Sequence, residues 1–362
     1  MSIPENTLIN DIRTSSNFKG ITLSGYKKTE VKKQFIENML KSKIEPACYW
    51  CAELICAGHF NDVWECILYF VGKHIHVANP KIIIYLDKRM QIFSNIVQQG
   101  HFTSELQLRN NLTIRKLFAE IITIIAISPK KNSFETIKIN RVEEFDITQM
   151  TDRFKAPNIT FIENIMMPED PKELIVPINE FAFQISNDKP NMLLACYWIE
   201  WIIEFDIICK KRKEPCLCQR RKNDVEYKYQ RDIIWMIWDT LIYYSSKLTP
   251  QNLFIENLMI SLKNIFITNY TSGCCKKRKY LLYYAVELLT EHVPNNIELI
   301  TRKEVLINVT EKINDVYKQI KKNEESPNTD YLFSGLNSNN NFEKSIQKMD
   351  MLNSIGFVPR NG

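Results

Sequence analysis

The chain has 362 residues, of which 45% are hydrophobic and 25% charged, and its formal net charge is +5. This composition is ordinary for a globular protein with a buried core, and the length predicts about two domains. Glycine is scarce, at 9 residues, and the sequence has no P-loop, dinucleotide-binding, zinc-protease or nucleophile-elbow motif. These features disfavour β sandwiches, phosphate loops and the common catalytic centres, so we expect no enzyme activity and no cofactor.

Two features indicate the compartment. Residues 1–16 hold no apolar stretch of the kind found in secretory signals, and no run reaches the roughly 18 apolar residues of a membrane span. The ten cysteines lie mostly in apolar helical segments, where a free thiol behaves as a small hydrophobic group. We therefore expect an intracellular protein without a membrane span, in the reducing cytoplasm or nucleus.

Cap residues and prolines predict five helices between residues 29 and 129. In chain order, the first runs from Thr29 to about Lys41, the second opens at Pro46 and ends near Gly58, the third is capped by Asn61 or Asp62, and the last two open at Pro80 and Thr113. Apolar residues recur at spacings of three and four, as one buried helical face requires: Trp50, Leu54, Trp64, Ile67, Leu68 and Val71.

Four sequence blocks occur twice in the same order and predict an internal duplication. ACYW at 47–50 recurs at 195–198, and VWECILYFVGK at 63–73 is similar to IWDTLIYYSSK at 237–247. The segments that start at Pro80 and Pro250 are similar, as are those that start at Arg115 and Arg278. The second copy carries extra residues within 205–232. Look-alike amphipathic helices are the alternative explanation.

We therefore predict an all-α fold of two tandem copies of a roughly five-helix unit. The expected boundaries are an N-terminal arm (1–28), repeat one (29–129), a connector (130–190), repeat two with a basic, Cys-containing insert (191–320) and a flexible tail (321–362). The connector is expected to be irregular, with room for a small hairpin, because 135–140 and 158–164 alternate like short strands. The polar tail ends in an apolar segment that either binds a protein partner or is a frayed end.

Positive charge is concentrated in the extra residues of repeat two. KKRKEPCLCQRRK at 210–222 holds seven basic residues against Glu214, a net +6 that exceeds the charge of the whole chain. A second cluster, at 276–279, begins a late helix of the same repeat, so we expect both clusters on one face. Such a patch suits salt-dependent phosphate contacts, and a solvated loop, a nuclear-import signal or a membrane-surface patch are the alternatives. The predicted nucleic-acid contacts are Lys210, Lys211, Arg212, Lys213, Arg220, Arg221, Lys222, Lys276, Lys277, Arg278 and Lys279.

Five cysteines accompany these clusters: Cys209, Cys216, Cys218, Cys274 and Cys275. Flanking Lys and Arg are expected to lower their thiol pKa values, which favours metal binding or redox reactivity. Cys-x-Cys and Cys-Cys are not the usual zinc-knuckle spacings, so we expect free thiols, with a zinc site as the alternative. His74 and His76 are expected as a surface pair, and Glu53 and Glu65 as helix-surface charges.

Three resemblances follow from these segments. Residues 47–82 resemble the collar-type helical domain of clamp-loader-related ATPases, through Ala47, Tyr49, Trp50, Ala52, Gly58, Ile75, Ala78, Asn79 and Pro80. No ATPase module accompanies them, so this implies a helical bundle without catalysis. Two five-helix repeats with a helix like ACYWCAELICAG are similar to the cyclin fold of general transcription factor B proteins. Most of the chain resembles an uncharacterised protein of large nucleocytoplasmic DNA viruses, which implies a viral factory in the host cytoplasm or nucleus.

Together these observations favour a non-enzymatic helical adaptor that contacts nucleic acid, or a viral replication or transcription machine, through the basic insert. The expected partners are nucleic acid or another polyanion, and a protein bound by the C-terminal tail. One alternative is a virion structural or assembly protein whose basic patch binds an acidic protein or a membrane surface. A cyclin-like transcription-factor module and an enzyme on an unfamiliar helical scaffold are the others.

Overall fold

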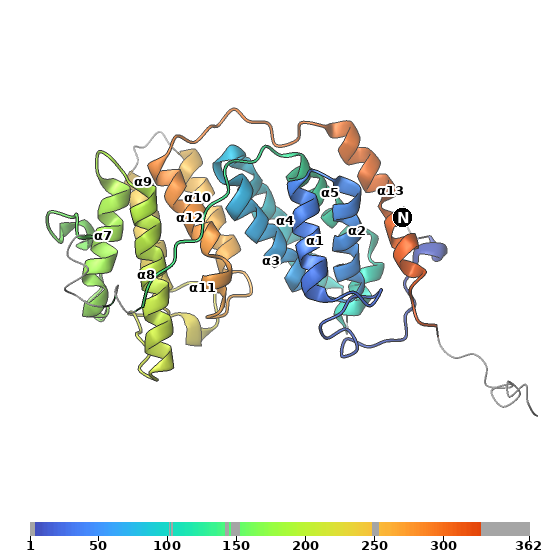
Figure 1. Cartoon of the computed structure of the whole chain (residues 1–362), viewed down its shortest axis with the longest axis horizontal. Coiled ribbons are helices and arrows are strands. Elements are labelled where there is room, and N and C mark those ends of the chain that lie inside the picture. Colours follow the sequence, from blue (N-terminus) through green and yellow to red (C-terminus); the bar gives the residue numbers. More distant parts are fainter. Residues whose placement is uncertain are drawn as a thin grey trace, which may run out of the picture.

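The computed structural model describes residues 4–100, 102, 104–141, 145, 153–247 and 253–326. Over these residues the chain is mostly helical and forms no strand, which confirms the all-α prediction. The predicted hairpin is wrong for the part of the connector that is described: 135–140 is irregular, and 160–162 is a turn of 3-10 helix. Figure 1 shows the helices gathered into two bundles that lie side by side.

The first bundle contains α1 (Lys28–Leu40), α2 (Ile44–Cys56), α3 (Phe60–Phe70), α4 (Lys81–Gln99) and α5 (Leu112–Ile127). Gly58 ends α2 as predicted, with a φ of 78° that glycine adopts at little cost. The amide of His59 donates to the Leu54 carbonyl and that of Gly58 to the Ile55 carbonyl, a Schellman arrangement.

The predicted caps of α1 and α3 are wrong by two or three residues. Lys27 precedes α1 and His59 precedes α3, so Thr29, Asn61 and Asp62 lie inside the helices. Asp62 instead forms ion pairs with Lys28 and Lys32 of α1, at 3.0 and 2.7 Å. The Asp62 carboxylate, which the local pattern predicts as a helix cap, therefore forms a tertiary contact with α1 instead.

The predicted apolar face of the first bundle is confirmed. Leu54, Trp64, Ile67, Leu68 and Val71 are all buried, and Trp50 is partly buried. Glu53 was expected at the surface but is fully buried, because the N-terminal arm covers this side of α2. The hydroxyl of Ser24 in that arm donates to Glu53 at 2.5 Å, which supplies the carboxylate with a partner.

The second bundle contains α7 (Ile175–Ser186), α8 (Met192–Lys211), α9 (Ile234–Lys247), α10 (Leu253–Ile267), α11 (Cys274–Lys277) and α12 (Lys279–Thr290). Its core is aromatic, with the fully buried side chains of Trp198, Trp235, Trp238, Tyr283 and Tyr284. α7 lies in the range predicted to be an irregular connector. It is helical because its apolar face packs along α8.

The two bundles share a packing order. α1 packs along α2 as α7 packs along α8, and α5 and α12 each contact both helices of their own pair. α4 and α10, which the predicted repeat makes equivalent, pack against each other between the bundles. This correspondence is what a duplication would produce, and the duplication itself stays a prediction.

The last described helix, α13 (Lys303–Lys321), returns to the first bundle. It packs against α2, α5 and the short helix η1 (Glu5–Thr7), as Figure 1 shows, although the predicted boundaries place it in repeat two. The reason is a buried guanidinium: Arg115 of α5 lies 3.9 Å from the ring centre of Tyr317 and donates to Asn314 at 3.0 Å. Arg115 also donates to the carbonyl of Thr7, which holds the arm in place.

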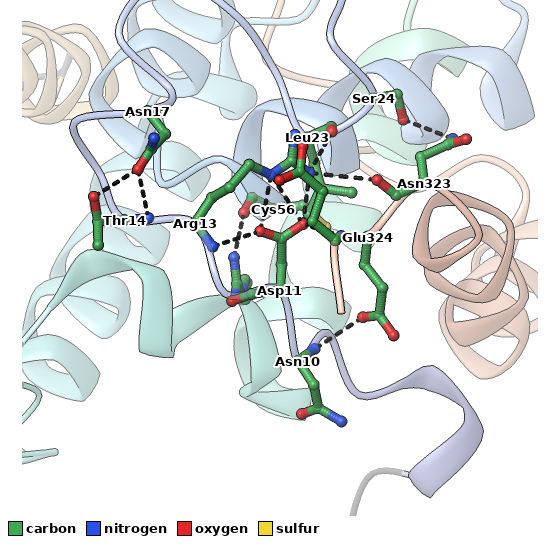
Figure 2. A network of polar contacts seen from close by, with 12 residues as sticks. Asn10, Asp11, Arg13, Thr14, Asn17, Leu23, Ser24, Cys56, Asn323 and Glu324 are labelled. Carbon is green, nitrogen blue, oxygen red and sulfur yellow. Dashed lines mark hydrogen bonds and ion pairs between the residues drawn. The ribbon is translucent and has the colours of Figure 1, made fainter. Parts of the chain in front are cut away.

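The segment after α13 is tied to the N-terminal arm by the polar network in Figure 2. The amide of Glu325 donates to Asp11, the amide of Asn10 donates to Glu324, and the side-chain amide of Asn323 donates to Ser24, each at 2.9 Å. The predicted partner-binding end of the tail lies outside the described residues.

A buried polar cluster joins the two bundles. Nδ1 of His76 lies 2.7 Å from Oε2 of Glu287 in α12, and Nε2 lies 3.1 Å from the carbonyl of Asn132. The His76 ring therefore links a carboxylate of the second bundle to a backbone carbonyl of the connector. Lys131 donates to Oε1 of Glu287 at 2.8 Å. His76 and its neighbour His74 are buried, so the expected surface pair is wrong: the connector covers both rings.

Glu287→Ala should lower the free energy of unfolding by about 3 kcal/mol, because it leaves His76 buried without its carboxylate partner. Glu291→Ala is the matched control, since Glu291 pairs with the same Lys131 at the exposed end of the cluster. It should cost less than about 1 kcal/mol. Urea denaturation measures both, and equal costs would show that the buried pair does not hold the bundles together.

Candidate nucleic-acid interface

The first predicted cluster begins at the C-terminal end of α8. The side chain of Lys210 turns back onto its own helix and pairs with Asp206 at 2.7 Å. It also lies 3.9 Å from the carboxylate of Asp232. Lys211, Arg212 and Lys213 are exposed. Lys213 has a φ of 62° and ends the helix. Positive charge is favourable at the end of a helix, which explains part of this cluster without a ligand.

The second cluster lies beside this end of α8. Lys276 and Lys277 are exposed on the short helix α11, and Nζ of Lys276 lies 3.7 Å from Oε1 of Glu204 in α8. Glu204 also accepts a hydrogen bond from Nε of Arg141 at 3.0 Å. The α8 carboxylate nearest the second cluster is therefore already paired, and the exposed Lys276 and Lys277 lie beside the helix that carries the first cluster at its end.

Arg278 and Lys279 are buried and do not belong to that surface, contrary to the prediction. Arg278 donates to Glu65 of α3 at 2.6 Å, and to the carbonyls of Phe266 and Thr268 at 2.7 Å each. Lys279 pairs with Glu200 at 2.6 Å. Both side chains point into the protein because the helix that follows α11 is buried on nearly every face. Glu65, expected as a free surface charge, is thus a contact between the bundles.

Arg221 is also buried, and the prediction that it contacts phosphate is wrong. Its guanidinium donates to both carboxylate oxygens of Asp170 and to one of Asp239, all at 2.7 Å. Burial opposes the charge, but these hydrogen bonds raise the pKa of Arg221 above its ordinary value. The side chain clamps the insert to the segment before α7 and to α9.

Arg220 and Lys222, on either side of Arg221, line a pocket of about 740 Å³ on the second bundle. Arg220 lies 3.4 Å from the ring centre of Tyr227, and Lys222 is exposed. The sequence gives no signal for Lys263, which enters this pocket from α10 as an isolated cation in an apolar helix.

A second hollow, of about 670 Å³, lies between α1 and α3 of the first bundle and α11 and α12 of the second. Lys32 and Lys33 line it from α1, opposite Lys276 and Lys277 of α11. Tyr69 and Tyr280 also line it, with their ring centres 5.5 Å apart. Glu37, Asp62 and Glu65 line it as well, so Lys276 and Lys277 stand at a cleft of mixed charge that the cluster pattern alone does not predict.

The cysteines do not form a metal site in the described part of the chain, where no three His, Cys, Asp or Glu side chains meet as ligands. Burial raises the pKa of Cys216, Cys218 and Cys275 to about 12, and that of Cys209 above its ordinary value. The predicted lowering by basic neighbours is therefore wrong. Cys274 accepts a hydrogen bond from the amide of Thr271 at 3.3 Å.

Comparison of the chain with protein-family models, curated proteins and solved structures finds no match to any of them. The three resemblances therefore stay predictions, and the site is argued from its geometry alone. No helix among the described residues has both the length and the apolar character that a membrane crossing needs.

Arg221→Met should lower the free energy of unfolding by about 3 kcal/mol, because Asp170 and Asp239 lose the cation that neutralises them. Lys222→Met, one residue further on and exposed, should change it by no more than about 0.5 kcal/mol. Chemical denaturation of the pair provides the measurement. If Arg221→Met were as stable as the wild type, the buried clamp would be refuted.

Cys216 should react slowly with iodoacetamide in the native protein. Its pKa of about 12 leaves little thiolate at pH 8, so alkylation should be at least about a hundredfold slower than that of free cysteine. The rate should rise about tenfold per pH unit between pH 8 and pH 11, as the thiolate fraction grows. Quantitative mass spectrometry of the labelled peptide tests this, and fast labelling at pH 8 would contradict it.

Proposed function

We propose that this chain is a helical adaptor that binds nucleic acid through a basic face of its second bundle. The basic face consists of Lys211, Arg212, Lys213, Lys276 and Lys277. The observation that carries the proposal is that the second cluster packs against the helix that ends in the first: Lys276 lies 3.7 Å from Glu204 of α8, about two turns before Lys211. The proposal keeps the predicted function but rests on fewer residues, since Lys210, Arg221, Arg278 and Lys279 serve the fold.

The electrostatics of the basic face support a polyanion as its partner. The carboxylates beneath it are already paired, Asp206 with Lys210 and Glu204 with Arg141. The contact between Lys276 and Glu204 is long, and 68% of the Lys276 side chain is exposed, so it costs little to exchange for a phosphate. Each phosphate that a cation neutralises releases counterions from the nucleic acid, which favours binding at low salt.

The buried polar groups support an adaptor rather than an enzyme. His76, Glu287, Glu200 and Glu53 are each held by internal partners in the core or between the bundles. Such groups stabilise the packing and have no free position for a substrate. The work of the protein then falls to its surface, where the residues of the basic face are exposed.

The triple variant Lys211→Glu, Arg212→Glu, Lys213→Glu should bind a short DNA duplex at least about tenfold more weakly than the wild type, at low salt. The slope of log affinity against log salt should fall by about 0.9 for each phosphate contact that is lost. Fluorescence anisotropy over a salt series measures both quantities.

The matched control is Lys303→Glu, Lys312→Glu, Lys318→Glu, which makes the same change in net charge on exposed residues of α13. It should weaken binding much less, because α13 lies on the first bundle. Equal losses in the two variants would mean that only total charge matters. Wild-type protein that fails to bind duplex or single strands at low salt would contradict the proposed function.

A further inference from the structure

A second surface of the same bundle has a different chemistry from the basic face. The insert folds back between 219 and 223 and forms one wall of the 740 Å³ pocket, here called the insert groove. The opposite walls come from α9, α10 and the segment at 164–167. Apolar surface from Ile165, Met167 and Ile242 lines it together with polar and basic side chains, which include Asn164, Gln219, Arg220, Lys222, Tyr243 and Lys263.

The charge balance of the insert groove is positive. Arg221 at its base is neutralised by Asp170 and Asp239. No carboxylate of the described residues lies within ion-pair distance of Arg220, Lys222 or Lys263. Burial lowers the pKa of the half-buried Lys263, and Asp239 opposes this only through its more distant charge. A bound anion would relieve that unfavourable environment.

Two tyrosines offer flat surfaces for stacking: Tyr243 lines the insert groove, and Tyr227 lies next to it against Arg220 of the lining. Tyr227 is 72% exposed with the Arg220 guanidinium over its ring. Tyr243 carries Lys247 at 4.3 Å from its ring centre and accepts a hydrogen bond from Asn164 at 2.9 Å. Aromatic rings and guanidinium planes are the surfaces on which unpaired bases stack in proteins that bind single strands.

Asn223 also lines the insert groove, and its side-chain nitrogen is buried without a hydrogen-bond partner, which is costly in a folded protein. The amide of Gln219 lines the same space and extends this polar edge.

We propose that the insert groove binds a single-stranded segment of nucleic acid. Lys222 and Lys263 contact its phosphates, and Tyr227, Tyr243 and Arg220 stack on its bases. A pocket of this volume suits one or two nucleotides, and bases inside a duplex cannot reach the tyrosines unless they unpair. The inference rests on the proposed function, because the basic face supplies the general attraction and the insert groove adds the preference for unpaired bases.

The test uses the full chain and a fluorescein-labelled oligothymidine strand of about twelve nucleotides, with a duplex of equal length beside it. Lys222→Gln with Lys263→Gln should weaken single-strand binding at least about tenfold and duplex binding less than about threefold. Tyr227→Ala, at an exposed side chain that the core does not need, should weaken only single-strand binding by about fivefold or more. Lys303→Gln with Lys312→Gln is the matched control.

The affinities of these variants for the strand and the duplex decide the proposal. A selective loss of single-strand affinity in both groove variants supports it. Equal losses of affinity for the strand and the duplex, or no loss for either, overturn it. Competition by thymidine monophosphate or inorganic phosphate at the same concentration as the oligonucleotide also overturns it, because that would show a small-molecule site. If reversal of the basic face leaves binding unchanged while the groove variants lose it, the proposed function of that face fails and the insert groove stands.

Discussion

The buried guanidinium of Arg278 is a polar anchor between the two bundles, beside the His76–Glu287 pair and the packing of α4 on α10. It donates to the carbonyls of Phe266 and Thr268, at the C-terminal end of α10, and to the Glu65 carboxylate of the other bundle. A planar group with five donors spread over three nitrogens reaches acceptors on different sides at once, whereas a lysine carries its three donors on a single nitrogen. Because Lys276 and Lys277 directly precede this anchor, they are held at the mouth of the cleft between the bundles.

The first bundle uses the equivalent position of the predicted repeat in a related way. Arg115 in α5 is also fully buried and donates to backbone carbonyls, those of Arg109 and Thr7. Its remaining contacts hold α13, whereas those of Arg278 hold the neighbouring bundle. A common arginine at the start of the last helix, with a diverged partner, agrees with the proposed duplication.

Sequence patterns predict the features of this protein that depend on near neighbours. The turn at Gly58, the apolar face from Leu54 to Val71 and the focus of charge at 210–222 all follow from local spacing or composition. Local spacing does not show that Arg221 is buried while Lys222 is exposed. The carboxylates that pair with Arg221, Asp170 and Asp239, are 51 and 18 residues away along the chain. The return of α13 to the first bundle depends in the same way on Arg115, Tyr317 and the N-terminal arm. The sequence does not predict that Lys263 lines a pocket, because a single lysine in an apolar helix is equally typical of a side that faces solvent.

Amide hydrogen exchange of the full chain, with and without nucleic acid, tests the central claim most directly, because it reports where the ligand covers the backbone. Our account predicts slower exchange at the end of α8, through the insert at 212–223 and over α11 when nucleic acid is bound, with α13 unchanged. Protection confined to α13 or the N-terminal arm, or no protection under conditions where binding is measured, would contradict it.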